Sequence, residues 1–150
     1  MMLLACALAP VASAAPAGTS ETKTVAVAIS WLGVKDLSGG NSRSGIDCSH
    51  LVYQVYKAVG AKDYYFMKVA DMKKNKNFVI TSSPRPGDVI FWKKDVTTSK
   101  RTYWLAAHVG IYIGSGRFIH TSWDTKKVSI DSVQGVYKTG QPYYAKWSKK

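Results

Sequence analysis

The chain has 150 residues, 46% hydrophobic and 20% charged, which fits one globular domain with an ordinary core, and we expect no second domain within it. Lysine and arginine number 21 against nine acidic residues, a formal net charge of +12 that suggests an anionic partner such as a wall polymer, lipid headgroups or nucleic acid. A merely solvated basic surface explains the charge equally well, whereas a single glutamate and dispersed aspartates argue against paired-carboxylate catalysis.

Residues 1–14 have the character of an export signal. The run from Met1 to Val11 is apolar apart from proline and small residues, and residues 12–14 (Ala-Ser-Ala) fit the small-x-small pattern that precedes a signal-peptidase site. We therefore expect a signal peptide over residues 1–14, a linker over 15–20, a domain over 21–150, and export to the periplasm or the cell exterior. No basic residue precedes the apolar run, so we expect either that the true start of the signal lies upstream or that the signal is atypical. The run is also too short to span a bilayer.

The chain has two cysteines, and Cys6 lies inside this apolar run. Its surroundings resemble a lipoprotein site only faintly, so lipid attachment is the less favoured alternative. Once the signal is removed, Cys48 is the one cysteine left, and a lone thiol cannot form an internal disulfide. In an oxidising compartment such a cysteine is better explained by chemistry than by stapling.

The first helix is predicted to begin at Ser20, which can cap it, and to end near Gly33. Val25, Ile29 and Leu32 recur on one face of this helix. We expect that apolar stripe to lie in the core.

The second helix is predicted to begin at Cys48, with Asp47 as its N-cap and Gly60 as its C-cap, because apolar residues recur at helical spacing between them. A helix start offers backbone N–H groups without intrahelical partners and carries partial positive charge. Both features favour thiolate over thiol, so Cys48 is a candidate nucleophile. The ordinary alternative is a small buried hydrophobic residue.

A further short helix is predicted over residues 63–76, with Phe66, Val69 and Ala70 facing inward. The rest of the chain predicts strands: a turn at 84–88 leads into a buried strand, a polar loop at 93–106 could overhang a cleft, and alternation resumes at His108. The predicted strands cover residues 89–92, 108–113, 117–122, 128–130, 133–137 and 143–147. Helices first and antiparallel strands second indicate an α+β domain.

The two strands at 108–113 and 117–122 form a predicted hairpin. We expect a three-residue loop with Gly116 in the left-handed conformation, so that Ile113 faces Arg117. His120 then lies opposite Gly110, where the missing side chain leaves room for an imidazole. A two-residue loop without a bulge would turn His120 to the other face.

In this register His108 and His120 share one face of the hairpin and lie one diagonal step apart. Either histidine alone is more often a structural residue than a catalyst. Two that converge near an activated cysteine favour catalysis, because a Cys–His pair needs a third polar group to orient the imidazole. The sequence therefore predicts Cys48 as nucleophile, His108 as base and His120 as orienting residue.

With these residues in view, the chain resembles the NlpC-type cysteine peptidases of bacterial cell walls. The resemblance spans roughly residues 30 to 125 and keeps the family's order and spacing. The matching segments are Gly39-Gly40, Gly45-Ile46-Asp47-Cys48-Ser49, Pro86-Gly87-Asp88-Val89-Ile90-Phe91, His108-Val109-Gly110-Ile111-Tyr112-Ile113-Gly114 and Gly116-Arg117-Phe118-Ile119-His120.

The resemblance implies a compact papain-like α+β fold, with N-terminal helices packed on an antiparallel β-sheet that carries the histidines. It also implies hydrolysis of peptidoglycan stem peptides, most often between D-glutamate and a diamino acid such as meso-diaminopimelate. By motif match, Cys48, His108 and His120 take the positions of the family's nucleophile, base and third residue. No cofactor is required.

Two positions depart from the family pattern. His50 stands where the family usually has glycine, and we expect it to be a surface or capping residue. Asp36 stands where a tyrosine often lines the active site, which puts the usual substrate preference in doubt. Asp36, Asp47 and Ser49 are the candidate substrate contacts.

Other interpretations of the function stay open. The same three residues would serve an amidase or an acyltransferase acting on another wall or lipid substrate, and a basic binding protein for wall polymer or nucleic acid is a remote alternative. A zinc site from Cys48, His50, His108 and His120 lacks the paired-cysteine spacing of structural sites, so we expect no metal. The expected partner is peptidoglycan rather than nucleic acid, with contact to anionic wall or membrane surfaces through basic patches, and we expect a monomer.

Overall fold

The computed structural model describes residues 20–92, 96–97, 102–103, 108–134 and 142–149. The predicted signal peptide, Cys6, and most of the predicted linker and of the 93–106 loop lie outside the described residues. None of the described helices is long and apolar enough to cross a membrane.

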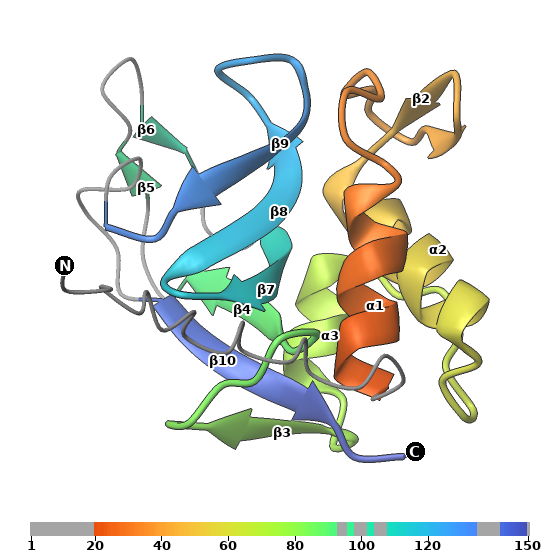
Figure 1. Ribbon diagram of the computed structural model, residues 1–150, viewed down its shortest axis with the longest axis vertical. Coiled ribbons are helices and arrows are strands. Elements are labelled where there is room, and N and C mark those ends of the chain that lie inside the picture. The colour runs from red at the N-terminus through yellow and green to blue at the C-terminus, as the bar shows by residue number, and fades with distance from the viewer. Residues whose placement is uncertain (1–19, 93–95, 98–101, 104–107, 135–141, 150) are drawn as a thin grey trace, which may run out of the picture.

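The described residues form an α+β domain, as predicted (Figure 1). Its helices are α1 (Ser20–Ile29), α2 (Cys48–Val59) and α3 (Val69–Lys74). A six-stranded antiparallel sheet has the order β3-β10-β4-β7-β8-β9, built from β3 (Phe78–Thr81), β4 (Val89–Trp92), β7 (Val109–Gly114), β8 (Arg117–Ser122), β9 (Lys127–Ser132) and β10 (Pro142–Trp147). Two small hairpins pair β1 (Asn41–Ser42) with β2 (Gly45–Ile46) and β5 (Val96–Thr97) with β6 (Thr102–Tyr103).

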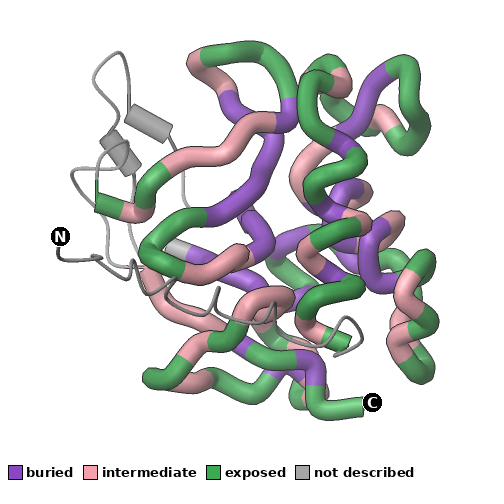
Figure 2. Tube along the Cα trace, viewed as in Figure 1, coloured by how far each residue is buried: buried purple, intermediate pink, exposed green. Residues whose placement is uncertain are grey.

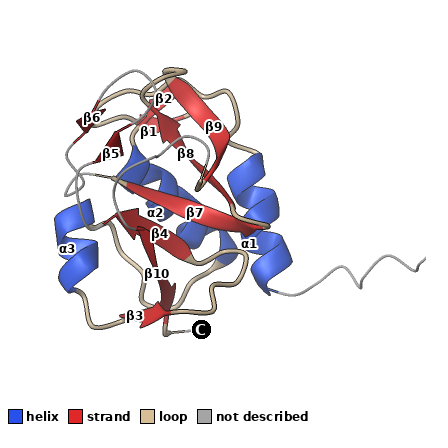
Figure 3. Ribbon diagram, turned by 90° about the vertical axis from the view of Figure 1, so that its left-hand side faces the viewer, coloured by secondary structure: helices blue, strands red, loops and turns tan. Residues whose placement is uncertain are grey.

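The two longer helices pack side by side against the middle of the sheet (Figures 1 and 3). Helix α2 contacts β7 and β8, and its apolar residues Leu51, Val52 and Val55 are fully buried there. The buried stretches of the chain gather where α2 faces these strands, which is where the core lies (Figure 2). The start of α2 is therefore held against the strands that carry the histidines.

The predicted core face of the first helix is wrong. Ile29 and Leu32 are 43% and 42% exposed, and the buried face carries Thr24, Ala28 and Trp31 instead. Close approach explains the difference: a Cβ built on Gly87 would lie 3.2 Å from Thr24 Cβ, so small residues on α1 let it pack near the turn before β4. The regular helix also ends at Ile29, before the predicted end.

The helix predicted over residues 63–76 is shorter than expected. It begins at Val69 and buries Val69 and Met72, while Ala70 is exposed and Phe66 lies outside the helix, 37% exposed. Because the helix begins later than predicted, its inward face is formed by Val69 and Met72. These two residues are three positions apart and so lie on the same side of the helix.

The strand assignments need three corrections. One is that β5 and β6 pair with each other within residues 93–106, which were predicted as a loop. Another is that β3 was not predicted. It is an edge strand in which Phe78 is buried while Val79 and Ile80 are 41% and 68% exposed, so it shows no apolar alternation. Of the strand predicted at 133–137, Val133 and Gln134 lie in a turn and the other three residues lie outside the described part of the chain.

The hairpin of β7 and β8, which carries His120, has the predicted pairing of residues but a different loop. Gly114, not Ile113, pairs with Arg117, so the turn has two residues, Ser115 and Gly116, with φ of 53° and 66°. A bulge between Tyr112 and Gly114 adds the residue that the shorter loop removes. The register therefore matches the prediction further along the strands, and the left-handed conformation of Gly116 is confirmed.

Beyond the bulge Ile111 pairs with Ile119, which places His120 opposite Gly110 one position further along. The sequence predicted room for an imidazole above Gly110, but the side chain nearest to that space is a phenyl ring. A Cβ built on Gly110 would lie 2.8 Å from Cδ2 of Phe118. The ring centroids of Phe118 and His120 are 4.5 Å apart, so the phenyl ring that lies next to Gly110 also contacts the histidine.

Candidate active site

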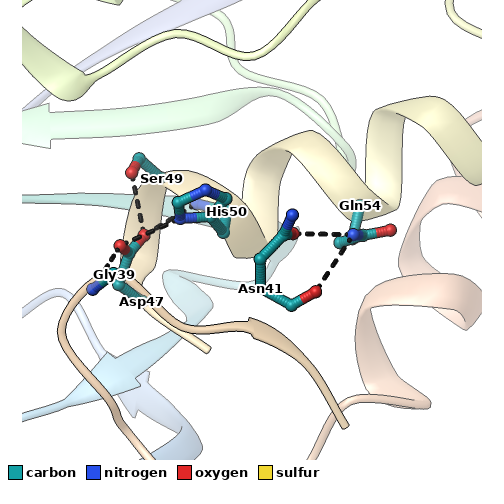
Figure 4. Close-up of polar contacts among 6 residues, drawn as sticks. All are labelled: Gly39, Asn41, Asp47, Ser49, His50 and Gln54. Atoms are coloured by element: carbon teal, nitrogen blue, oxygen red, sulfur yellow. Dashed lines mark hydrogen bonds and ion pairs between the residues drawn. The ribbon is translucent and has the colours of Figure 1, made fainter. Parts of the chain in front are cut away.

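Asp47 caps the start of α2, as predicted (Figure 4). Its Oδ1 accepts from the backbone N–H of His50 and from the Ser49 hydroxyl, both at 2.8 Å. Its Oδ2 accepts from the Gly39 N–H at 3.1 Å and lies 2.9 Å from Nδ1 of His50. The carboxylate thus ties the loop before α2 to the helix's first turn.

These contacts hold the Asp47 side chain in its charged form. Burial alone would raise the pKa of Asp47, but hydrogen bonds from His50 and Ser49 outweigh burial and leave the pKa below its ordinary value. A negative charge therefore stands directly before Cys48 in the chain.

Cys48 is the first residue of α2 and half-buried, packed against the core. Burial, with added repulsion from Asp47 and Asp36, raises the pKa of the thiol to about 12, although the backbone N–H groups of Val109 and Ser49 act in the opposite direction. The helix start alone therefore does not produce a thiolate at neutral pH, contrary to the expectation from sequence. Because Val109 follows His108 directly, its interaction with the sulfur places Cys48 beside the beginning of β7.

His108 and His120 lie together, as the hairpin register predicts. Nε2 of His108 is 2.8 Å from Nδ1 of His120, and the ring planes are inclined by 75°. Both side chains are completely buried. The structure therefore brings the predicted base and the predicted orienting residue into hydrogen-bonding contact.

Asp131 was not predicted from the sequence. Its Oδ2 lies 2.7 Å from Nε2 of His120, on the side of the ring away from His108. In the antiparallel pair β8–β9, His120 is opposite Ser129, so Asp131 is its diagonal neighbour on the same face. The residue follows directly after the strand predicted at 128–130, and a two-residue alternation from Ser129 is the signal that could have found it.

Burial keeps both rings neutral at pH 7. Burial lowers the pKa of His108 well below its usual value, and the nearby His120 and Lys73 lower it further. Burial also lowers the pKa of His120, although the hydrogen bond and the charge of Asp131 oppose that shift. The resting site therefore pairs a neutral thiol with neutral imidazoles.

Trp123 is a second residue near His108 that was not predicted from the sequence. Its ring centroid is 4.2 Å from that of His108, with the planes tilted by 44°. It belongs to the turn that follows β8 and is half-buried. The indole thus forms part of the cover over His108.

Asp36 lies close enough to Cys48 to act on the thiol electrostatically. Its backbone bridges to Ile46, and its N–H donates to the Lys126 carbonyl at 2.9 Å. Burial raises the pKa of the half-buried carboxyl, and attraction from Lys126 partly offsets this. Asp36 also interacts electrostatically with Asp47 and His120, so an acidic side chain stands close to the candidate site.

His50 lies in the first turn of α2 and binds the capping residue Asp47, in line with the prediction of a surface or capping residue. Its ring binds Asp47 and stacks on Phe66 with centroids 4.1 Å apart and planes 14° from parallel. Within the described ranges, no three His, Cys, Asp or Glu side chains form a group suited to a metal ion.

The fold and this group of residues define a class of protein: an α+β domain in which a cysteine at a helix start lies beside strands that carry paired histidines. The model of the NlpC/P60 family matches residues 34–146, and the chain belongs to that family.

Curated relatives agree with this assignment. The chain is 32% identical over 126 residues to the gamma-DL-glutamyl hydrolase of Bacillus subtilis (strain 168), covering 83% of this chain and 28% of that protein. It is 30% identical over 107 residues to the murein DD-endopeptidase MepS/murein LD-carboxypeptidase of Escherichia coli (strain K12), covering 71% and 52%. The chain thus spans about half, or less, of the length of these relatives.

Solved structures share the fold. The NlpC/p60 domain of the peptidoglycan hydrolase SagA superposes with a TM-score of 0.62 at 27% identity, covering 84% of this chain and 97% of that one. RipD of Mycobacterium tuberculosis, described as a non-catalytic domain adapted to peptidoglycan binding, gives a TM-score of 0.61 at 20% identity, covering 86% and 98%. The second likeness concerns the fold alone.

Proposed function

We propose that this chain is a cysteine endopeptidase that hydrolyses the stem peptides of peptidoglycan. The observation that carries the proposal is the buried pair of His108 and His120, joined at 2.8 Å, beside the half-buried Cys48. Membership of the NlpC/P60 family and relatives named as murein endopeptidases support the substrate class.

In the proposed mechanism His108 takes the proton of Cys48, and the sulfur attacks the carbonyl carbon of the scissile peptide bond. Because burial favours the neutral thiol and the neutral imidazole, proton transfer accompanies the attack instead of preceding it. Backbone N–H groups at the start of α2, including that of Cys48, stabilise the oxyanion. His108 then protonates the leaving amine, and water hydrolyses the thioester to release the acid and restore the thiol.

We propose the bond between D-glutamate and meso-diaminopimelate as the one cleaved. A relative named gamma-DL-glutamyl hydrolase supports a glutamyl bond. Asp36, Asp47 and Ser49 are the proposed substrate contacts. Asp47 and Ser49 are already hydrogen-bonded to each other at the start of α2. The carboxyl of Asp36 lies outside that cap.

The proposed site of action is outside the cytoplasm, since the substrate is cell-wall polymer. Residues 1–14 would direct export and residues 15–20 would link the signal to the domain. We propose that the protein acts as a monomer, with its basic surface, part of a net charge of +12, facing anionic wall or membrane surfaces.

The test is digestion of purified peptidoglycan of known stem composition, followed by mass analysis of the fragments. We expect new amino termini on meso-diaminopimelate and new carboxyl termini on D-glutamate from the wild type, and none from Cys48→Ala. Cleavage by Cys48→Ala would overturn the proposal, and termini between glycan and peptide would indicate an amidase instead.

The second candidate is a non-catalytic wall-binding protein, which the high positive charge favours. It predicts that the wild type and Cys48→Ala sediment with peptidoglycan equally, in a salt-sensitive way, and that neither releases fragments. Release of fragments that is stopped by thiol alkylation excludes it.

A further inference from the structure

Asp131, His120 and His108 form a continuous hydrogen-bonded series that leads from β9 toward Cys48. The two contacts measure 2.7 Å and 2.8 Å. We propose that Asp131 is a positioning residue that fixes the tautomers of both histidines, so that Nδ1 of His108 is the nitrogen that takes the Cys48 proton. The catalytic part of this inference rests on the proposed function, and the tautomer part does not.

The tautomers follow from counting hydrogens along the series. An ionised carboxylate has no hydrogen to donate, so the hydrogen between Asp131 and His120 belongs to Nε2 of His120. In a neutral ring the other nitrogen is then an acceptor, so Nδ1 of His120 accepts from Nε2 of His108. Neutral His108 therefore carries its hydrogen on Nε2 and has the basic lone pair on Nδ1.

The reverse order would disable the site. If His120 carried its hydrogen on Nδ1, His108 Nε2 would have to accept it, and His108 would then carry its own hydrogen on Nδ1. That nitrogen could not take a proton from a thiol. A carboxylate at position 131 excludes this arrangement because it accepts and cannot donate.

The series also stabilises the charge that forms during the reaction. When His108 becomes an imidazolium, its Nε2–H donates to His120, which in turn donates to the Asp131 carboxylate. Both rings are fully buried and Asp131 is only 18% exposed, so water screens this interaction weakly. The negative charge of Asp131 thus acts on His108 through His120.

Two variants test the role of the carboxylate. Asp131→Asn keeps the size and one accepting oxygen, but it removes the charge and adds an NH2 group that can donate to His120, so it no longer excludes the reversed order. Asp131→Leu removes the acceptor altogether. Asp124→Asn is the matched control, because Asp124 also acts electrostatically on His120 and its loss removes one nearby charge. Thermal unfolding of each variant, followed by circular dichroism, identifies those that are folded at the assay temperature.

The first measurement is the ¹⁵N chemical shift of the ring nitrogens, which needs no substrate. We expect the hydrogen on Nε2 of both His108 and His120 in the wild type and in Asp124→Asn, and a mixture of tautomers in Asp131→Leu. A wild-type His108 with its hydrogen on Nδ1, or unchanged tautomers in folded Asp131→Leu, would overturn the proposal.

The second measurement is the pH profile of peptidoglycan cleavage. We expect kcat of Asp131→Asn to fall about tenfold or more with KM nearly unchanged, because the transition state loses charge stabilisation. The acidic limb should move to lower pH, since Asp131 raises the pKa of His120 and its neutral substitute does not. An Asp131→Asn profile equal to that of Asp124→Asn would contradict the positioning role, whereas a wild type that cleaves nothing would count against the proposed function and leave the tautomer result standing.

Discussion

Asp47 and His50 bind each other twice at the start of α2. One oxygen of the Asp47 carboxylate accepts from the His50 backbone N–H at 2.8 Å, and the other lies 2.9 Å from the His50 ring. The carboxylate therefore stabilises the helix start, but its charge also raises the pKa of Cys48, the next residue. Two substitutions at position 47 separate these effects.

Asp47→Ala should destabilise the domain by about 2 kcal/mol, because the cap is lost and the partly buried donors of Ser49 and His50 lose their partner. Asp47→Asn should cost less, since its amide oxygen can still accept from His50 and Ser49. Urea unfolding measures both, and equal losses for the two variants would contradict the capping role.

Asp47→Asn should also lower the pKa of Cys48 from about 12, because a repelling charge is removed. The alkylation rate with iodoacetamide, measured from pH 7 to 10, reports the thiolate fraction. We expect faster alkylation of Asp47→Asn than of the wild type at each pH. A rate that is unchanged or slower would show that the Asp47 charge does not act on the sulfur.

Gly110→Ala should destabilise the sheet, although alanine usually stabilises a strand relative to glycine. The added methyl group would lie 2.8 Å from the Phe118 ring, 3.1 Å from the Ile119 carbonyl oxygen and 3.2 Å from an Ile90 methyl group, so the neighbours must move. We expect a loss of about 1–3 kcal/mol in urea unfolding.

The matched test for Gly110→Ala is a double-mutant cycle with Phe118→Leu, which removes the ring that the methyl group meets first. We expect the double variant to be more stable than the sum of the single losses predicts. If the two losses of stability simply add, the methyl group of Gly110→Ala does not clash with the Phe118 ring.

The parts of the site that were predicted from the sequence depend on interactions between residues close together in the chain. Asp47, Gly60 and the Cys48 helix followed from local rules, because caps and helical spacing act within a few residues. The hairpin brought His108 and His120 together even though the predicted loop length was wrong, since a bulge compensated for the shorter turn. These features lie close together in the chain.

Contacts between distant segments were not predictable in the same way. The buried face of α1 is set by close packing near Gly87, which favours Thr24 and Ala28 over larger apolar residues. Asp131 comes to His120 through the register of β9, and the single sequence does not specify that register. The sequence pattern therefore located Cys48 and the two histidine rings, but not the carboxylate that binds one of them.

The buried histidines should make the domain less stable in mild acid. Burial lowers the pKa of both His108 and His120, so below about pH 6.5, the ordinary value, the unfolded chain binds protons that the folded chain does not. The free energy of unfolding should therefore keep its full value, as far as these histidines are concerned, above that pH. It should decrease as the pH falls through it.

Urea unfolding at intervals from pH 7.5 to 5.5 measures this dependence. Asp36 and Asp88 have raised pKa values, which act in the opposite direction, so the comparison is made with His120→Asn in the same buffers. We expect a shallower loss of stability on acidification in His120→Asn. An equal slope in the two proteins would assign the pH dependence to other groups.

Trp123 should control the acid–base behaviour of His108. Burial is the largest cause of the lowered pKa of His108, and the Trp123 ring, 4.2 Å away, forms part of its cover. Trp123→Ala should therefore admit water and raise the pKa of His108 toward its ordinary value, whereas Trp123→Phe should keep much of the cover. NMR titration of the His108 ring measures the shift directly, and the acidic limb of peptidoglycan cleavage should move to higher pH in Trp123→Ala alone. A His108 titration that is the same in Trp123→Ala and the wild type would mean that the sheet and α2 bury the ring without help from the indole.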